Sequence, residues 1–114
     1  MATMTKRLTI IVLALALALV VSGGPAWAAD AAAGKAVFTS KCQTCHAADG
    51  SGNPGLGKAL GVTWVPLGSA DVQKMSDDDL KKVITGGKGK MKPVSSVSGA
   101  DLDNVVAYVR TLKK

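Results

Sequence analysis

The sequence contains few of the side chains that hold metal ions. Its 114 residues include one histidine, two cysteines and no glutamate, and all eight acidic residues are aspartates. Structural zinc sites almost always use four ligands, drawn mostly from cysteine and histidine, and this chain has only three such residues. The one histidine and both cysteines also lie within a single five-residue segment. A zinc site is therefore disfavoured, and any metal chemistry must be sought in that segment.

Aromatic residues are equally scarce. After residue 28 the chain has only Phe38, Trp64 and Tyr108. A domain of 86 residues is at the small end of what can hold a hydrophobic core unaided, and three aromatic side chains are few for such a core. We therefore expect one domain in which a bound apolar cofactor forms part of the interior.

The longest uncharged hydrophobic stretch, residues 8–21, is too short to cross a membrane. It has fourteen residues, whereas a spanning helix needs roughly 20. Basic residues precede it and a small-x-small cleavage signal at residues 26–28 follows it, as in secretory signal peptides. We expect residues 1–28 to be a signal peptide cleaved near Ala28. Residues 29–114 would then form the mature periplasmic domain, without a stable membrane anchor.

The segment Cys-Gln-Thr-Cys-His at residues 42–46 indicates covalent attachment of a c-type haem. On one helical turn, Cys42, Cys45 and His46 project from the same side. The two thiols can form thioethers with the vinyl groups at one edge of a porphyrin, while a His46 nitrogen ligates the iron. A disulfide or a thioredoxin-like redox pair is the alternative. The latter would need a strand before the motif, whereas residues 31–41 have a helical pattern.

Three helices and no persuasive strand are predicted in the mature domain. Asp30 suits the N-cap of the first helix. Ser76 with Asp79, and Ser98 with Asp101, have the spacing of capping boxes for the second and third helices. The third helix carries an apolar stripe at helical spacing, formed by Leu102, Val105, Val106, Val109 and Leu112.

A Gly-rich segment, residues 47–61, separates the first two helices and is expected to be a loop. Because it follows His46 directly, it must wrap the proximal side of the ring. A ligating histidine needs its other nitrogen held by an acceptor, often a backbone carbonyl. Pro54 has no N–H and offers its carbonyl without a competing donor, so it is a candidate for this contact with His46. An ordinary surface loop is the alternative.

The sixth position of the iron would fall to a methionine. The chain has no second histidine, and after residue 28 the only methionines are Met75 and Met91. Met75 precedes the Ser76 cap and suits packing at a helix junction. Met91 lies among lysines and glycines, where a thioether gains little by packing. We favour Met91 as the distal ligand over Met75, and a lysine amine would first have to be deprotonated.

Trp64 is the remaining candidate for contact with the cofactor. It is either an ordinary core aromatic or a residue of the haem wall whose N–H bonds a propionate. Packing against the haem does not require that hydrogen bond, so we include Trp64 among the cofactor-binding residues.

The mature chain resembles class I (monohaem) cytochromes c of the small bacterial periplasmic type. The matching residues are Gly34-x-x-x-Phe38, the 42–46 motif, Asn53-Pro54, the segment 86–93 and Val105-x-x-Tyr108. The resemblance implies an all-α cytochrome c fold, with three main helices and loops wrapped around one covalently bound haem c. It also implies that the first and last helices cross beside the haem, with Gly34 against Tyr108. One departure is Lys92, which intervenes before Pro93 where the family often has proline directly after the methionine.

The same resemblance implies an electron carrier that is not an enzyme, with His46 and Met91 ligating the iron in both redox states. The alternative is an open-site c-type haem sensor or a peroxidase-like protein, which the lack of a distal histidine or arginine opposes.

The expected partners are redox proteins, and the carrier is expected to be a monomer. The mature chain has twelve basic residues against eight aspartates, with one arginine and no basic stretch interleaved with aromatics, so nucleic-acid binding is not expected. A positive rim around the haem cleft would steer an acidic partner, although a solvated basic loop is an equal alternative. The lysines concerned are Lys41, Lys58, Lys88, Lys90 and Lys92.

Overall fold

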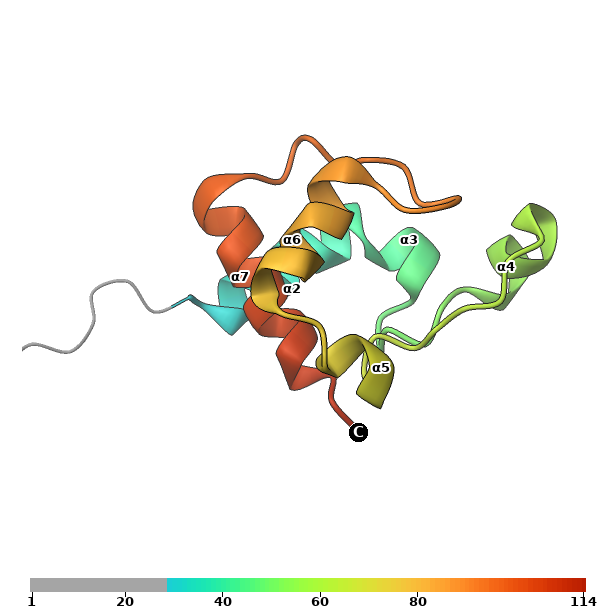
Figure 1. The fold of residues 1–114 in the computed structure, drawn as a ribbon, viewed down its shortest axis with the longest axis horizontal. Helices are drawn as coiled ribbons and strands as arrows, with labels where there is room; N and C mark the ends of the chain where they lie inside the picture. Colours follow the sequence, from blue (N-terminus) through green and yellow to red (C-terminus); the bar gives the residue numbers. More distant parts are fainter. Residues whose placement is uncertain (1–28) are drawn as a thin grey trace, which may run out of the picture.

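The computed structural model describes residues 29–114, so the predicted signal peptide at 1–28 lies outside the described residues. Within 29–114 the chain is helical, and its only β-type pairing is an isolated bridge between Lys88 and Met91. This confirms the predicted all-α class. The helices, in chain order (Figure 1), are α2 (Ala31–Lys41), α3 (Gln43–His46), α4 (Pro54–Leu60), α5 (Ala70–Gln73), α6 (Asp77–Gly86) and α7 (Gly99–Thr111).

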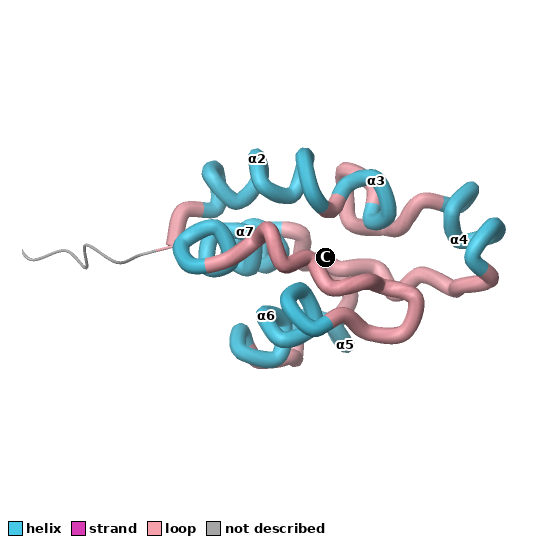
Figure 2. Tube along the Cα trace, turned by 90° about the horizontal axis from the view of Figure 1, so that it is seen from above, coloured by secondary structure: helices cyan, strands magenta, loops and turns pink. Residues whose placement is uncertain are grey.

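The first and last described helices, α2 and α7, lie side by side, as both views of the chain show (Figures 1 and 2). Gly34 makes the close approach possible, because a Cβ at this position would collide with the carbonyl of Asn104 and lie 3.0 Å from the nitrogen of Val105. The predicted crossing is therefore confirmed, with the backbone of Asn104 and Val105 nearest to Gly34, while the contact of Gly34 with Tyr108 stays a prediction. Tyr108 packs on Phe38, with ring centroids 5.1 Å apart and ring planes at 58°.

The hydrophobic core lies at this crossing. Phe38 from α2 and Val105 from α7 are each 1% exposed, and Val97 from the segment before α7 is 2% exposed. Partly buried apolar residues pack around these three side chains, namely Val37, Cys42, Leu67, Ile84, Val94, Leu102 and Tyr108. Because Cys42 is among them, the start of the Cys-x-x-Cys-His motif is fixed to the core.

The helix caps agree with the sequence at two of three places. Asp30 Oδ1 accepts from the N–H groups of residues 32 and 33, at 2.9 and 3.1 Å. Ser76 Oγ accepts from the N–H of Asp79 at 3.1 Å. Ser98 occupies the N-cap position of α7, but its side chain makes no capping hydrogen bond, so the predicted capping box there is wrong. Gly99 follows with φ +55, and this left-handed first residue changes the direction in which the chain enters α7.

The segment 47–61 is not wholly a loop, because its second half forms α4. Asn53 Oδ1 accepts from the N–H groups of residues 55 and 56, at 3.0 and 3.2 Å. Pro54 occupies the first turn, where a backbone N–H would have no partner within the helix, so its absence in proline costs no hydrogen bond. Gly61 ends the helix in the left-handed conformation. Both views place α4 at one end of the described domain, away from the α2–α7 pair (Figures 1 and 2).

None of the helices in residues 29–114 is long and apolar enough to span a membrane.

Candidate haem-binding site

The short helix α3 carries the Cys-x-x-Cys-His motif and follows α2 almost without a break. The N–H of Cys42 still donates to the carbonyl of Phe38 at 2.8 Å, and the N–H of His46 donates to the carbonyl of Cys42 at 3.0 Å. Cys42, Cys45 and His46 therefore lie on one helical turn, as the spacing predicts, and all three border the same cavity. Ala47, with φ 61, then turns the chain away from the helix.

The chain after His46 folds back onto α3. The N–H of Gly52 donates to the carbonyl of His46, and the N–H of Asn53 donates to the carbonyl of Cys45, both at 2.8 Å. The side-chain amide of Asn53 also donates to the carbonyl of Thr44 at 3.2 Å. These bonds satisfy carbonyls at the C-terminal end of α3 that have no partner within a helix. They fix the position of the histidine.

A cavity of about 420 Å³ is bordered by residues of every described helix, from α2 to α7, and by residues of the loops between them. This volume falls within the range of about 300–1,000 Å³ that is usual for ligand and cofactor sites. Most of its walls are apolar side chains, while Cys42, Cys45 and His46 supply thiols and an imidazole. Both cysteines are free thiols. An apolar cavity with two thiols and one imidazole at its border fits a covalently attached haem.

Burial changes the protonation of the motif residues. It lowers the pKa of His46, so the imidazole remains neutral at neutral pH, which is the form that can ligate a metal. Burial, with a smaller effect from the neighbouring Cys45, raises the pKa of the Cys42 thiol. Cys45 is exposed, and Cys42 is half-buried. The two thiols of the motif are therefore not equivalent in the described structure.

Trp64 borders the cavity beside His46, with ring centroids 5.8 Å apart and planes at 58°. Its indole N–H donates to the carbonyl of Asn53 at 2.6 Å. Because this N–H already bonds a backbone carbonyl, the structure opposes a bond between Trp64 and a propionate. The indole forms part of the cavity wall. Two glycines that the sequence did not single out allow this packing. A Cβ at Gly52 would collide with the indole, and a Cβ at Gly57 would lie 2.5 Å from the indole nitrogen.

Both methionines of the described chain border the cavity. Met91 follows a tight turn in which the backbone groups of Lys88 and Met91 exchange two hydrogen bonds of 2.9 Å. Gly87, with φ +76, begins this turn, and the N–H of Val94 donates to the carbonyl of Ile84 at 2.8 Å as the chain returns. Met75 reaches the cavity from the junction of α5 and α6. The structure thus brings both candidate thioethers to one cavity.

Of the six predicted cofactor-binding residues, five border the cavity, namely Cys42, Cys45, His46, Trp64 and Met91. Pro54 does not border it. It begins α4, directly after Asn53, whose backbone is bonded to Cys45. Its contact with His46 stays a prediction, as do the axial ligands themselves.

Comparison with known proteins finds relatives among the c-type cytochromes. The chain is 35% identical over 109 residues to cytochrome c6 from Picosynechococcus sp., covering 91% of this chain and 92% of the relative. It is 36% identical over 91 residues to cytochrome c-554(547) from Halothiobacillus neapolitanus, covering 75% of this chain and all of the relative. The solved structure of KustC0563 c-type cytochrome matches with a TM-score of 0.59 and 30% identity, covering 71% of this chain and 98% of that one.

The fold, the motif and these relatives define a small c-type cytochrome. The chain belongs to the family described as cytochrome C oxidase, cbb3-type, subunit III, whose profile matches residues 29–109. The resemblance to monohaem cytochromes c is confirmed, and with it covalently bound haem c as the cofactor. The protein transfers electrons to redox partners and is not an enzyme.

Proposed function

We propose that the protein is a soluble periplasmic carrier of single electrons, with its iron held between His46 and Met91. The observation that carries this proposal is the shared cavity, which is bordered by the two thiols, the imidazole and the Met91 thioether. A haem bound there supplies one-electron chemistry between ferrous and ferric iron. Cys42 and Cys45 hold it covalently, and the apolar walls exclude water, which favours the ferrous form.

His46 is the proximal ligand in this proposal, and its surroundings support that role. The lowered pKa keeps the ring neutral, and the bonds from Gly52 and Asn53 to the end of α3 hold its backbone in place. Pro54 lies next to Asn53 and is proposed to accept a hydrogen bond from the second ring nitrogen of His46. Trp64 restricts the ring from another side.

The alternative of an open-site sensor or peroxidase is less well supported. Met91 borders the cavity and offers a soft sulfur that would close the sixth position. Arg110, the one arginine in residues 29–114, is engaged by the carbonyls of Gln73 and Met75 and by the carboxylate of Asp77. Its guanidinium is therefore not available to assist peroxide chemistry.

Two alanine variants test the ligand assignment. We expect covalent haem to be retained on a denaturing gel by wild type, Met91→Ala and Met75→Ala alike, because both thioether bonds remain. Only Met91→Ala should lose the low-spin spectrum and the sulfur-to-iron charge-transfer band of the oxidised protein. If Met75→Ala loses the band and Met91→Ala keeps it, Met75 is the ligand. A wild-type protein without the band would favour the open-site alternative.

We further propose that the redox partner has an acidic docking surface. Lys88 and Lys90 are exposed and border the cavity, so positive charge lies at its rim. Lys41, Lys58 and Lys92 are exposed as well. Such charge can raise association rates by about 10–10³-fold at low salt.

Electron transfer to an acidic redox protein, measured against salt concentration, tests the docking proposal. Lys88→Gln should slow the reaction at low salt and flatten its salt dependence. Lys35→Gln removes the same charge from the exposed surface of α2 and should change little. A wild-type rate that does not vary with salt would argue for a solvated basic loop.

Export and oligomeric state complete the proposal. Processing near Ala28 would release a monomer into the periplasm. N-terminal sequencing of the protein from a periplasmic extract should begin at or near Ala29, and a retained leader would contradict this.

A further inference from the structure

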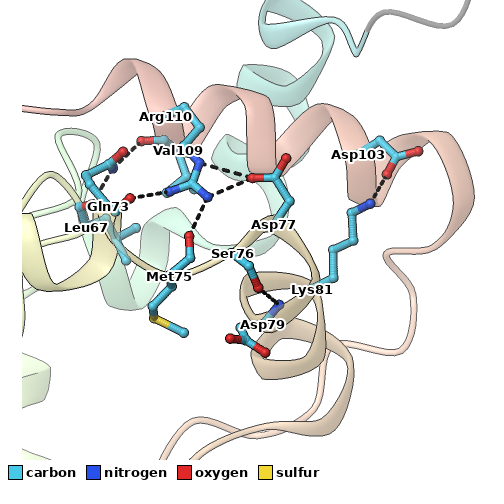
Figure 3. A network of polar contacts seen from close by, with 10 residues as sticks. All are labelled: Leu67, Gln73, Met75, Ser76, Asp77, Asp79, Lys81, Asp103, Val109 and Arg110. Carbon is cyan, nitrogen blue, oxygen red and sulfur yellow. Dashed lines mark hydrogen bonds and ion pairs between the residues drawn. The ribbon is translucent and has the colours of Figure 1, made fainter.

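The side chain of Arg110 leaves α7 and contacts the junction of α5 and α6 at three acceptors (Figure 3). Nη1 donates to the carbonyl of Gln73 at 3.0 Å, and Nη2 donates to the carbonyl of Met75 at 2.6 Å. Nη2 and Nε also donate to Asp77 Oδ1, at 2.7 and 3.1 Å. Because a guanidinium presents its donors in a rigid planar fork, it fixes these three points relative to one another.

Gln73 extends the same attachment toward the start of α5. Its side-chain nitrogen donates to the carbonyl of Leu67 at 2.8 Å and to the carbonyl of Val109 at 3.0 Å. Helix α5 is only four residues long, and none of its residues is buried. Side-chain hydrogen bonds from Arg110 and Gln73 therefore tie segment 67–77 to α7, in addition to the packing of Leu67 against the core.

This segment forms one wall of the haem cavity. Leu67, Val72 and Met75 all border the cavity, whereas Arg110 and Gln73 do not. The carbonyl of Met75 is bonded to Arg110, while the side chain of the same residue borders the cavity. Met75 therefore connects the guanidinium directly to the cavity wall, through its own backbone.

We propose that Arg110 is a positioning residue for the haem site, which holds the wall formed by Val72 and Met75 closed and so helps to set the reduction potential. The proposal rests on the proposed function, since it requires a haem in this cavity. With the fork in place the wall excludes water. Without it, water enters, the polarity around the iron rises, and the ferric form is favoured.

The positive charge of Arg110 offers a competing explanation, because any cation near the iron favours the ferrous form. Two variants separate charge from position. Arg110→Lys keeps the charge but replaces the fork with a single ammonium that cannot reproduce its planar geometry. Lys81→Met removes a charge from the same α6–α7 interface, where Lys81 pairs with Asp103. Lys81 is a close control for Arg110 in burial, because the Lys81 side chain is 30% exposed and that of Arg110 is 29% exposed.

The experiment combines redox titration with hydrogen exchange on the haem-loaded proteins. At a fixed applied potential, Arg110→Lys should lower the ratio of ferrous to ferric protein by about tenfold, a shift of about 59 mV. Lys81→Met should change it by less than about twofold, because a partly exposed charge is screened. In Arg110→Lys the amides of Lys74 and Met75, which donate to carbonyls of Ala70 and Val72, should exchange faster. They should not do so in Lys81→Met.

Gln73→Met provides a second test that leaves Arg110 in place. It removes the side-chain bonds to Leu67 and Val109, while the backbone carbonyl of Gln73 can still accept from Arg110. We expect a shift in the same direction as in Arg110→Lys, with the sulfur-to-iron band retained.

Three results would overturn the inference. If Arg110→Lys has the wild-type reduction potential, the charge of Arg110 explains its whole effect on the potential and its geometry explains none. Equal shifts in Arg110→Lys and Lys81→Met would indicate a general loosening of the interface. Wild-type protein without covalent haem would refute the proposed function as well, and the haem stain identifies that case separately.

Discussion

Replacing Gly34 with alanine should separate the two helices on which the core depends. The added Cβ would lie 3.0 Å from the nitrogen of Val105 and closer still to the carbonyl of Asn104. Both neighbours are backbone atoms, so no change of rotamer can relieve the contact. The helices must move apart, and Phe38 and Val105, each 1% exposed, lose part of their packing.

The magnitude follows from opposing effects. Overpacking costs about 1–3 kcal/mol. Complete burial of a side chain such as Phe38 or Val105 is worth about 1.5–3 kcal/mol, and part of this is lost. Alanine returns about 1 kcal/mol through its higher helix propensity. We expect a net loss of about 2–4 kcal/mol in the free energy of unfolding, which for a domain of this size lowers Tm by roughly 10–25 °C.

Thermal unfolding of the haem-loaded proteins, followed by circular dichroism, measures this difference. Gly86→Ala is the matched control, because Gly86 ends α6 and a Cβ there would meet nothing within 4 Å. That control should unfold at or slightly above the wild-type temperature. If Gly34→Ala unfolds together with Gly86→Ala, the crossing tolerates a side chain and the close approach does not stabilise the fold.

Two further predictions concern the loops. Gly87→Ala should destabilise the protein by about 1–3 kcal/mol and weaken the sulfur-to-iron band, because φ is +76 and the new Cβ would lie 2.6 Å from the carbonyl of Met91. Unfolding by denaturant and an oxidised spectrum measure both effects, and an unchanged variant would show that the turn tolerates a side chain. Hydrogen bonds from Ser51 lower the pKa of Asp49 in the folded protein. The charged carboxylate therefore stabilises the fold at pH values above the ordinary carboxyl pKa, and this stabilisation is lost on acidification. The difference in Tm between wild type and Asp49→Asn should therefore shrink below about pH 4, and a difference independent of pH would refute this.

The sequence predicted the elements whose signals are local. Asp30 and Ser76 cap their helices because the side chain that accepts and the N–H groups that donate are within three residues of each other. Ser98 has the same spacing to Asp101, but the left-handed conformation of Gly99 intervenes. A cap is therefore predictable only where the residues between its two partners have ordinary helical geometry.

Helix α4 shows the opposite error, since its signals were present but were outweighed by composition. Asn53 before Pro54, with Gly61 at the end, is a capped and terminated helix of seven residues. The glycines within it indicated a loop, because glycine is unfavourable in helix interiors. One of them, Gly57, is required by the indole of Trp64, a tertiary contact that no local pattern contains.

The site was predictable to a similar extent. Spacing alone placed Cys42, Cys45 and His46 together, because one helical turn decides their arrangement. The approach of Trp64 and both methionines to the same cavity depends on how distant segments fold back, which periodicity does not specify. The partner of the Trp64 N–H was missed for the same reason, since residue 53 and residue 64 meet only through the return of the chain after α4.

The pairing of α2 with α7 also determines when the domain can acquire its native structure during synthesis. Gly34 and Asn104 are separated by almost the whole described region, so a nascent chain has no partner for its first helix until the last one has emerged. Contacts this distant in sequence form slowly, because the intervening segment must first be closed into a large loop. The cysteines, by contrast, become accessible early, near the beginning of the domain. Chemical modification of these thiols can therefore precede completion of the tertiary fold.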